Sequence, residues 1–140
     1  MRVRYLLIVA LLAISSSLTL IGQQASSSQG KSPAGVVLTE RDNGTDVDLS
    51  PNSSLTVKLP SNPSTGYAWT VVGDPSPLKL QKNSFRKGAT KSGTVGASGT
   101  SVFQLSATSA GMATLTLVYR RSWEYNLPPM KTFTVRVNVR

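Results

Sequence analysis

The chain has 140 residues, contains no cysteine and no histidine, and carries a formal net charge of +9 at pH 7. The lack of cysteine excludes disulfides, thiolate metal sites and a thiol nucleophile, and the lack of histidine removes the commonest general base and transition-metal ligand. The composition therefore argues against an enzyme, and we expect no cofactor, no bound metal and no small-molecule substrate.

The N-terminal residues have the pattern of an export signal. Arg2 and Arg4 provide two positive charges, and the run 5–14 that follows is apolar throughout. After three serines the apolar character partly resumes, so that the run approaches the ~17–25 residues that span a bilayer. We expect residues 1–25 to be either a cleaved signal peptide or an N-terminal membrane anchor, and residues 26–34 to be a flexible leader. The protein is then exported, periplasmic or extracellular, and contacts a membrane only through an uncleaved N-terminal segment.

Residues 35–140 are expected to form one domain, stabilised by packing alone. Apolar and polar residues alternate with period two in four segments, which indicates half-buried strands. In chain order, these segments are residues 54–59, 103–107, 113–119 and 133–139. Weaker strand patterns fit residues 36–40, 47–49, 67–72 and 78–81.

Seven or eight short strands in a domain of this size predict an all-β fold, an immunoglobulin-like antiparallel β-sandwich. The cysteine pair of antibody domains is absent. We expect the domain to be a monomer.

Charged residues form an acidic and a basic cluster. The acidic cluster contains Glu40, Asp42, Asp46 and Asp48. We interpret it as a solvated turn with charged flanks, and the alternative is a weak calcium site, which would need several oxygens in a closed loop.

The basic cluster contains Lys79, Lys82, Arg86, Lys87 and Lys91. We interpret it as a solvated basic loop that attracts an acidic protein. Phe85 is the one aromatic residue nearby and export separates the domain from most nucleic acid, so nucleic-acid binding is not expected.

Two connections between the expected strands have residues that suggest a binding role in addition to a turn. The first, residues 60–66, contains two prolines that fix φ and a glycine that permits unusual backbone geometry. Its tip, Ser64-Thr65, presents two small hydroxyls, with no histidine to activate either as a nucleophile. The alternative interpretation is a tight turn packed by Tyr67 and Trp69. The second connection, residues 93–100, is rich in glycine, and its backbone can approach a partner closely.

A third connection, residues 119–129, contains Arg121 and Trp123, two residue types that are enriched in binding hot spots. The alternative is an arginine stacked on the tryptophan within the loop. A phosphate-binding role for the glycine-rich connection is not expected, because a strand follows it instead of a helix.

The three connections resemble those of the chagasin-like inhibitors of papain-family cysteine proteases. Residues 59–69 resemble the family's Asn-Pro-Thr-Thr-Gly-Tyr/Phe signature with its flanks, residues 96–99 its glycine-rich loop, and residues 121–123 its Arg-Pro-Trp loop. The motifs occur in the family's order, and the resemblance extends over about residues 36–140.

The resemblance implies a reversible inhibitor whose three loops lie together at one end of the sandwich and occlude the active-site cleft of a papain-like protease. Thr65 matches the residue that lies near the protease's cysteine and histidine. The implied protease-binding residues are Asn62, Pro63, Ser64, Thr65, Gly66, Tyr67, Gly96, Ala97, Ser98, Gly99, Arg121, Ser122 and Trp123. The alternative function is a non-inhibitory immunoglobulin-like binding or adhesion module that uses the same loops.

The sequence departs from the family pattern at three positions. Ser64 replaces a threonine but keeps the hydroxyl, and Ser98 stands where a glycine is usual, which changes how closely that loop can approach. Ser122 replaces the proline beside Trp123, which predicts a less rigid third loop.

Overall fold

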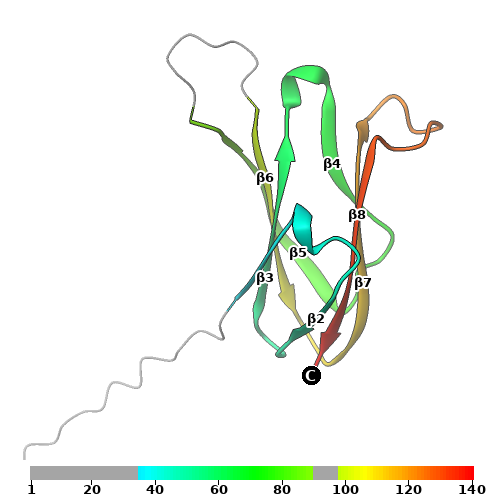
Figure 1. Ribbon diagram of the computed structural model, residues 1–140. Helices are drawn as coiled ribbons and strands as arrows, with labels where there is room; N and C mark the ends of the chain where they lie inside the picture. The colour runs from blue at the N-terminus through cyan, green and yellow to red at the C-terminus, as the bar shows by residue number, and fades with distance from the viewer. Residues whose placement is uncertain (1–34, 90–97) are drawn as a thin grey trace, which may run out of the picture.

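The computed structural model describes residues 35–89 and 98–140, which form an all-β domain (Figure 1). The period-2 segments are strands, as expected, because each has one face that another layer covers. The eight strands are β1 (Val36–Thr39), β2 (Asp46–Leu49), β3 (Ser54–Ser61), β4 (Tyr67–Val72), β5 (Leu78–Lys87), β6 (Gly99–Ala107), β7 (Gly111–Arg121) and β8 (Lys131–Val139). Two short 3-10 turns are η1 (Glu40–Asp42) and η2 (Pro63–Thr65).

The strands form two four-stranded sheets, sheet A in the order β1-β3-β6-β5 and sheet B in the order β2-β8-β7-β4. The first two strands are divided between the layers: β1 pairs with β3 and β2 pairs with β8, both in parallel. All other pairs are antiparallel. The expectation of an immunoglobulin-like sandwich is confirmed.

The core lies between the two sheets and is built from the alternate residues that the period-2 pattern assigned to one face. Burial of these side chains is the main stabilising term for a domain without disulfides. The most deeply buried members of the core are Leu55, Val57, Leu59, Phe103 and Leu105 from sheet A and Leu115, Leu117, Phe133, Val135 and Val137 from sheet B.

Strand β5 differs from expectation, since it continues to Lys87. It is the edge strand of sheet A, and a bulge between Leu80 and Lys82 shifts the register, so its apolar alternation is broken. Four residues of the basic cluster, Lys79, Lys82, Arg86 and Lys87, therefore lie on a strand, and their interpretation as a loop was wrong. Lys91 lies outside the described residues.

The strand directions bring the strand ends that flank the three candidate connections to one end of the domain. In sheet A the pairs Ser61↔Gly99 and Lys87↔Gly99 place the end of β3, the end of β5 and the start of β6 at the same level. In sheet B the pair Tyr67↔Arg121 does the same for β4 and β7. Figure 1 shows the β3–β4 and β7–β8 connections at the same end of the sandwich. We call this the loop end.

Candidate functional site

The first connection is a tight turn that its own side chains hold in shape. Asn62 precedes η2, and its carbonyl accepts hydrogen bonds from the Thr65 backbone N–H (3.2 Å) and from Thr65 Oγ1 (2.6 Å). Ser64 Oγ donates to Asn62 Oδ1 at 2.6 Å. Gly66 closes the turn with a left-handed φ of 80°, and its N–H donates to the Pro63 carbonyl. Both hydroxyl protons are thus used inside the turn.

Two aromatic residues support this turn from below. The Tyr119 hydroxyl accepts a hydrogen bond from the Asn62 N–H at 2.9 Å, and Trp69 Nε1 donates to the Pro60 carbonyl at 2.8 Å. Both rings are buried, and their centroids lie 5.1 Å apart. The alternative interpretation, a tight turn packed by Tyr67 and Trp69, is therefore correct for Trp69, which supports the turn. Tyr67 is only half-buried and lies beside Tyr119.

Arg121 joins the first connection to the third. Its Nε donates to the Thr65 carbonyl at 3.1 Å, and its Nη1 forms an ion pair with Glu124 at 3.1 Å. The guanidinium lies 4.6 Å from the centroid of the Tyr67 ring and 5.9 Å from that of Trp123. The alternative of an arginine stacked on Trp123 within the loop is thus met in part, because the closer ring is Tyr67 on the neighbouring strand. This arrangement, which we call the Arg121 clip, holds the two loops as one body.

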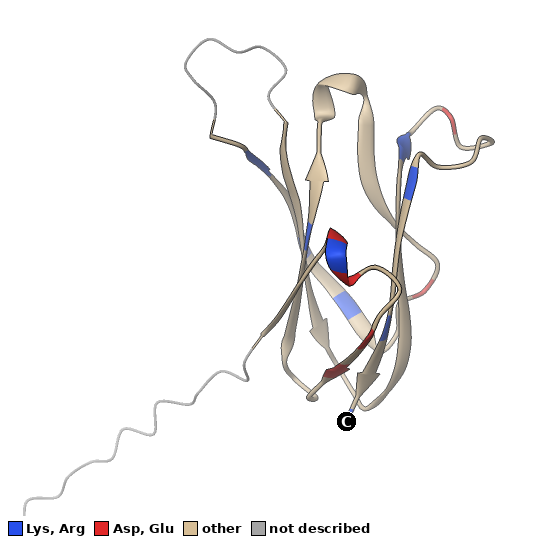
Figure 2. Cartoon of the chain, viewed as in Figure 1, with Lys and Arg blue, Asp and Glu red and all other residues tan. Residues whose placement is uncertain are grey.

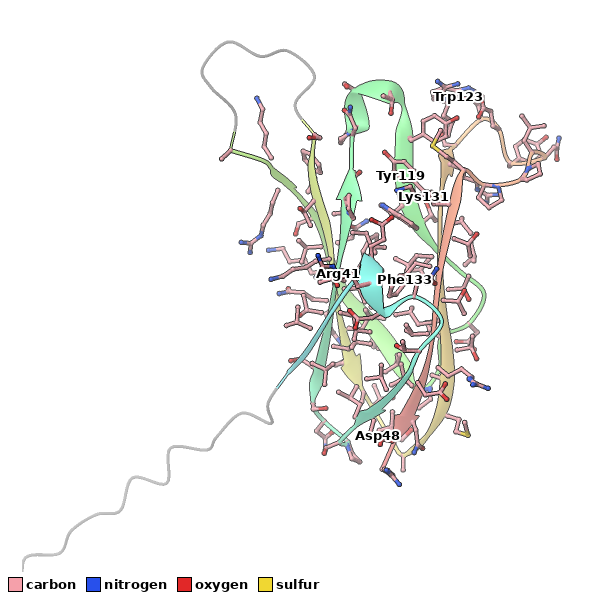
Figure 3. All side chains as sticks on the ribbon, in the orientation of Figure 1. Arg41, Asp48, Tyr119, Trp123, Lys131 and Phe133 are labelled. Carbon is pink, nitrogen blue, oxygen red and sulfur yellow. The ribbon has the colours of Figure 1, made fainter. Side chains whose placement is uncertain are left out.

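Trp123 lies across Gly66 and remains 65% exposed. A β-carbon added at Gly66 would come within 2.6 Å of Trp123 Cη2, so the indole packs directly on the glycine backbone. Figure 3 shows Trp123 at the loop end, with Tyr119 and Lys131 below it. An aromatic ring held beside the tip of the first loop but open to solvent is suited to bury against a partner.

The β7–β8 connection carries further exposed apolar side chains that the sequence analysis did not select. Tyr125, Leu127 and Met130 are all large, apolar and exposed. Arg120 steadies this part of the loop, since its Nη1 donates to the Tyr125 carbonyl at 3.3 Å. Their signal in the sequence was a run of bulky residues in a segment without strand alternation.

The second connection is described only at its base. Gly96 and Ala97 lie outside the described residues, whereas Ser98 and Gly99 are within them. The Ser98 carbonyl accepts the Gly88 N–H at 3.1 Å, which closes the base of the β5–β6 hairpin. A β-carbon at Gly99 would collide with the Arg86 carbonyl and come within 2.6 Å of the Phe85 ring, so glycine is needed there for packing.

A shallow hollow of about 190 Å³ brings the second connection beside the first. It is lined by Pro60, Ser61, Asn62, Ser98, Tyr119 and Lys131. Ser98 of the second connection thus lies beside Asn62 of the first, while Arg121 and Trp123 of the third contact Thr65 and Gly66 of the first.

The acidic cluster lies in η1 and β2, coloured red in Figure 2, and is engaged in ion pairs and local hydrogen bonds. Lys131 pairs with Glu40 at 2.8 Å, Arg136 with Asp46 at 2.7 Å and Arg140 with Asp48 at 2.7 Å. The hydrogen bond from Arg140, followed by that from Asn138, lowers the pKa of Asp48 below its ordinary value. Within residues 35–89 and 98–140, no three histidine, cysteine or acidic side chains are grouped as metal ligands, and no helix there is long and apolar enough to cross a membrane.

An immunoglobulin-like sandwich with stiffened loops at one end has the architecture of binding proteins that contact a partner through loop tips, as antibody variable domains do. Residues 48–137 match the Chagasin family peptidase inhibitor I42, and the chain belongs to this family. The resemblance seen in the motifs is confirmed.

Similar proteins of known identity agree with this assignment. Amoebiasin-2 of Entamoeba histolytica is 31% identical over 104 residues, which cover 74% of this chain and 85% of the relative. Chagasin of Trypanosoma cruzi is 29% identical over 104 residues, covering 70% of this chain and 92% of chagasin. The crystal structure of the Entamoeba histolytica cysteine protease inhibitor EhICP2 matches with a TM-score of 0.69 at 30% identity, over 76% of this chain and 96% of that one.

Proposed function

We propose that this protein is a reversible inhibitor of papain-like cysteine proteases whose loop end occludes the active-site cleft. Membership of an inhibitor family supports the class, and the Arg121 clip is the observation that supports the mechanism. Because the clip and the contact of Trp123 with Gly66 fix two loops relative to each other before binding, little conformational entropy is lost on association.

The first loop blocks the protease without being cut. Its backbone is held in a 3-10 turn, while the Thr65 carbonyl accepts a hydrogen bond from Arg121. A peptide bond fixed in this turn cannot extend along the cleft to reach the attack geometry that cleavage requires. The tip fills the space in front of the catalytic cysteine, and the turn's hydrogen bonds oppose its conversion into a substrate.

The burial pattern divides the implied binding residues into two roles. Pro63, Ser64, Thr65, Ser98, Ser122 and Trp123 are exposed and are proposed to contact the protease. Asn62, Gly66, Tyr67, Gly99 and Arg121 are partly buried among the loops and are proposed to position the others. Gly96 and Ala97 stay predicted contacts from the resemblance.

Inhibition assays test this proposal. Protease–inhibitor complexes with interfaces of about 1,600 Å² are among the tightest known, so the domain should block papain at stoichiometric concentration. Thr65→Asp should weaken inhibition sharply, because it introduces a charge at a desolvated contact. Absence of inhibition across several papain-like enzymes at micromolar protein would favour the alternative binding or adhesion module.

We further propose that the protein acts outside the cytoplasm, with residues 1–25 as the export signal or anchor. The two arginines followed by the apolar run support this proposal. Expression in a native host followed by N-terminal sequencing separates the two forms: a cleaved signal gives a start near residue 26, and an anchor leaves Met1 in place in the membrane fraction.

A further inference from the structure

The charges of the domain are segregated between its elements (Figure 2). The strands of sheet A contain Lys58, Lys79, Lys82, Arg86 and Lys87 and no carboxylate. The acidic residues of the chain instead lie in η1, in β2, in the β4–β5 connection and in the β7–β8 connection. Sheet A is therefore a cationic layer.

The strand register places four of these cations on the outer face of sheet A. Val102 of β6 alternates with the core residues Phe103 and Leu105 and so faces outward, and its pair partners Lys58 and Ser84 face the same way. Likewise, Lys79 pairs with Ser106, Lys82 with Gln104 and Arg86 with Thr100, all positions that alternate with the buried ones. We call Lys58, Lys79, Lys82 and Arg86 the basic face.

The basic face follows the register of the sheet rather than being a random scatter of charge. Val102, the pair partner of Lys58, is only 3% exposed although it does not belong to the hydrophobic core cluster, which fits a long side chain whose aliphatic stem lies along the sheet while its charged end reaches solvent. From Lys79 to Arg86 the strand extends about 23 Å at roughly 3.3 Å per residue. Within the described ranges, the ion pairs of the domain involve none of these four side chains.

We propose that the basic face docks the domain on an anionic phospholipid surface. The face fits a planar array of negative headgroups, and its strands carry no outward aromatic side chain for stacking on bases or sugars. The position of the N-terminal segment agrees: β1 is the other edge of sheet A, so the 35 residues before it join the domain at this sheet. If the N-terminal segment is inserted in the membrane, the basic face therefore lies within reach of the lipid headgroups.

Docking through this face leaves the loop end free. The loop end lies at the ends of the strands, whereas the basic face lies on their side. With sheet A flat on the bilayer, Thr65 and Trp123 point along the surface rather than into it. A protease at the same surface could still be bound.

Vesicle binding by the domain, residues 35–140, tests the proposal. EhICP2 matches over 96% of its own chain and 76% of this one, so a domain of this size is expected to fold without the preceding segment. Lys79→Gln/Lys82→Gln/Arg86→Gln is compared with Arg41→Gln/Arg136→Gln/Arg140→Gln, which removes the same charge outside sheet A. Sedimentation with phosphatidylcholine vesicles, with and without phosphatidylglycerol, measures the partition coefficient, and thermal unfolding confirms that both variants fold.

The domain should bind the vesicles that contain phosphatidylglycerol, and binding should fall as salt rises. Each basic residue near such a surface contributes about fivefold, so the basic-face variant should bind about 100-fold more weakly, with the control variant much less affected. Equal losses in both variants, or no binding to either vesicle, overturn the proposal. A slower association of the basic-face variant with an acidic protease, without vesicle binding, would also overturn it and assign the face to a protein partner. Inhibition by vesicle-free protein is measured separately, so failure of one proposal is distinguishable from failure of the other.

Discussion

Substitution of Gly66 by alanine tests whether the first and third loops act as one body. The glycine has φ of +80°, where an L-residue costs about 1–2 kcal/mol. The new methyl group would also lie 2.6 Å from Trp123 Cη2, where ordinary contacts are about 3.5–4.0 Å, so the indole must move by about 1 Å. The protein should therefore lose both stability and the position of its exposed aromatic ring.

The effect on inhibition can be scaled from the value of a binding tryptophan. Hot-spot side chains contribute about 2–4 kcal/mol to the binding free energy, and a displaced ring loses part of this contribution. A loss of about 2 kcal/mol corresponds to an increase of about 30-fold in the inhibition constant for papain. The free energy of unfolding should fall by about 1–2 kcal/mol in the same variant, as measured by denaturant titration.

Gly73→Ala is the matched control. Gly73 has a similar φ of +75°, but a β-carbon there has no neighbour within 4 Å, and the residue follows β4 at the end opposite the loops. It should lose the same stability and keep its inhibition constant. If both variants inhibit equally well, Trp123 does not depend on Gly66 for its position or does not contribute to binding, and the reasoning fails.

Three further predictions address the supports of the loop end and the ion pairs. Arg121→Lys keeps the charge but loses the planar group that reaches both Thr65 and Glu124, so the complex with papain should dissociate about tenfold faster by stopped-flow or surface binding; an unchanged rate would contradict the clip. Tyr119→Phe leaves the Asn62 N–H without its partner and should cost about 1–3 kcal/mol of unfolding free energy, whereas a neutral result would mean that water replaces the hydroxyl. Asp48→Asn should lower the melting temperature at neutral pH, because a carboxyl whose pKa is lowered in the folded state stabilises the fold at pH values above its unfolded pKa of 3.8. The difference from the parent should vanish as pH falls through the lower folded pKa, and a difference that persists in acid would exclude this origin.

The strands that were predictable from the sequence are those with one buried face. β8 alternates along its whole buried stretch, and β7 alternates up to Leu117, because β-strand side chains point to opposite sides and sheet A covers only one of them. β5 was predicted too short since an edge strand has a weaker packing requirement, and its bulge interrupts the pattern at Leu80. Edge strands are commonly rich in lysine, which prevents pairing with other chains and also makes them resemble loops in a sequence.

The tip of the first loop was predictable because proline and glycine impose their geometry locally. The contacts between loops were not predictable. Thr65 and Arg121 are 56 positions apart in the sequence, and no local pattern in either segment indicates that they contact each other. The sequence indicated Arg121 as a protease contact by residue type, whereas its position assigns it first to the loops themselves. Tyr125, Leu127 and Met130 were not predictable as exposed, because apolar residues in an irregular segment carry no periodicity that separates a buried from an exposed position.

The inward hydrogen bonds of Ser64 and Thr65 have a consequence for the kinetics of inhibition. These hydroxyl protons are already bonded to Asn62 in the free protein, so docking need not exchange their partners or refold the turn. The encounter step should then proceed at a similar speed with different target enzymes. What distinguishes a strong target from a weak one should be the lifetime of the complex, as is usual among related complexes.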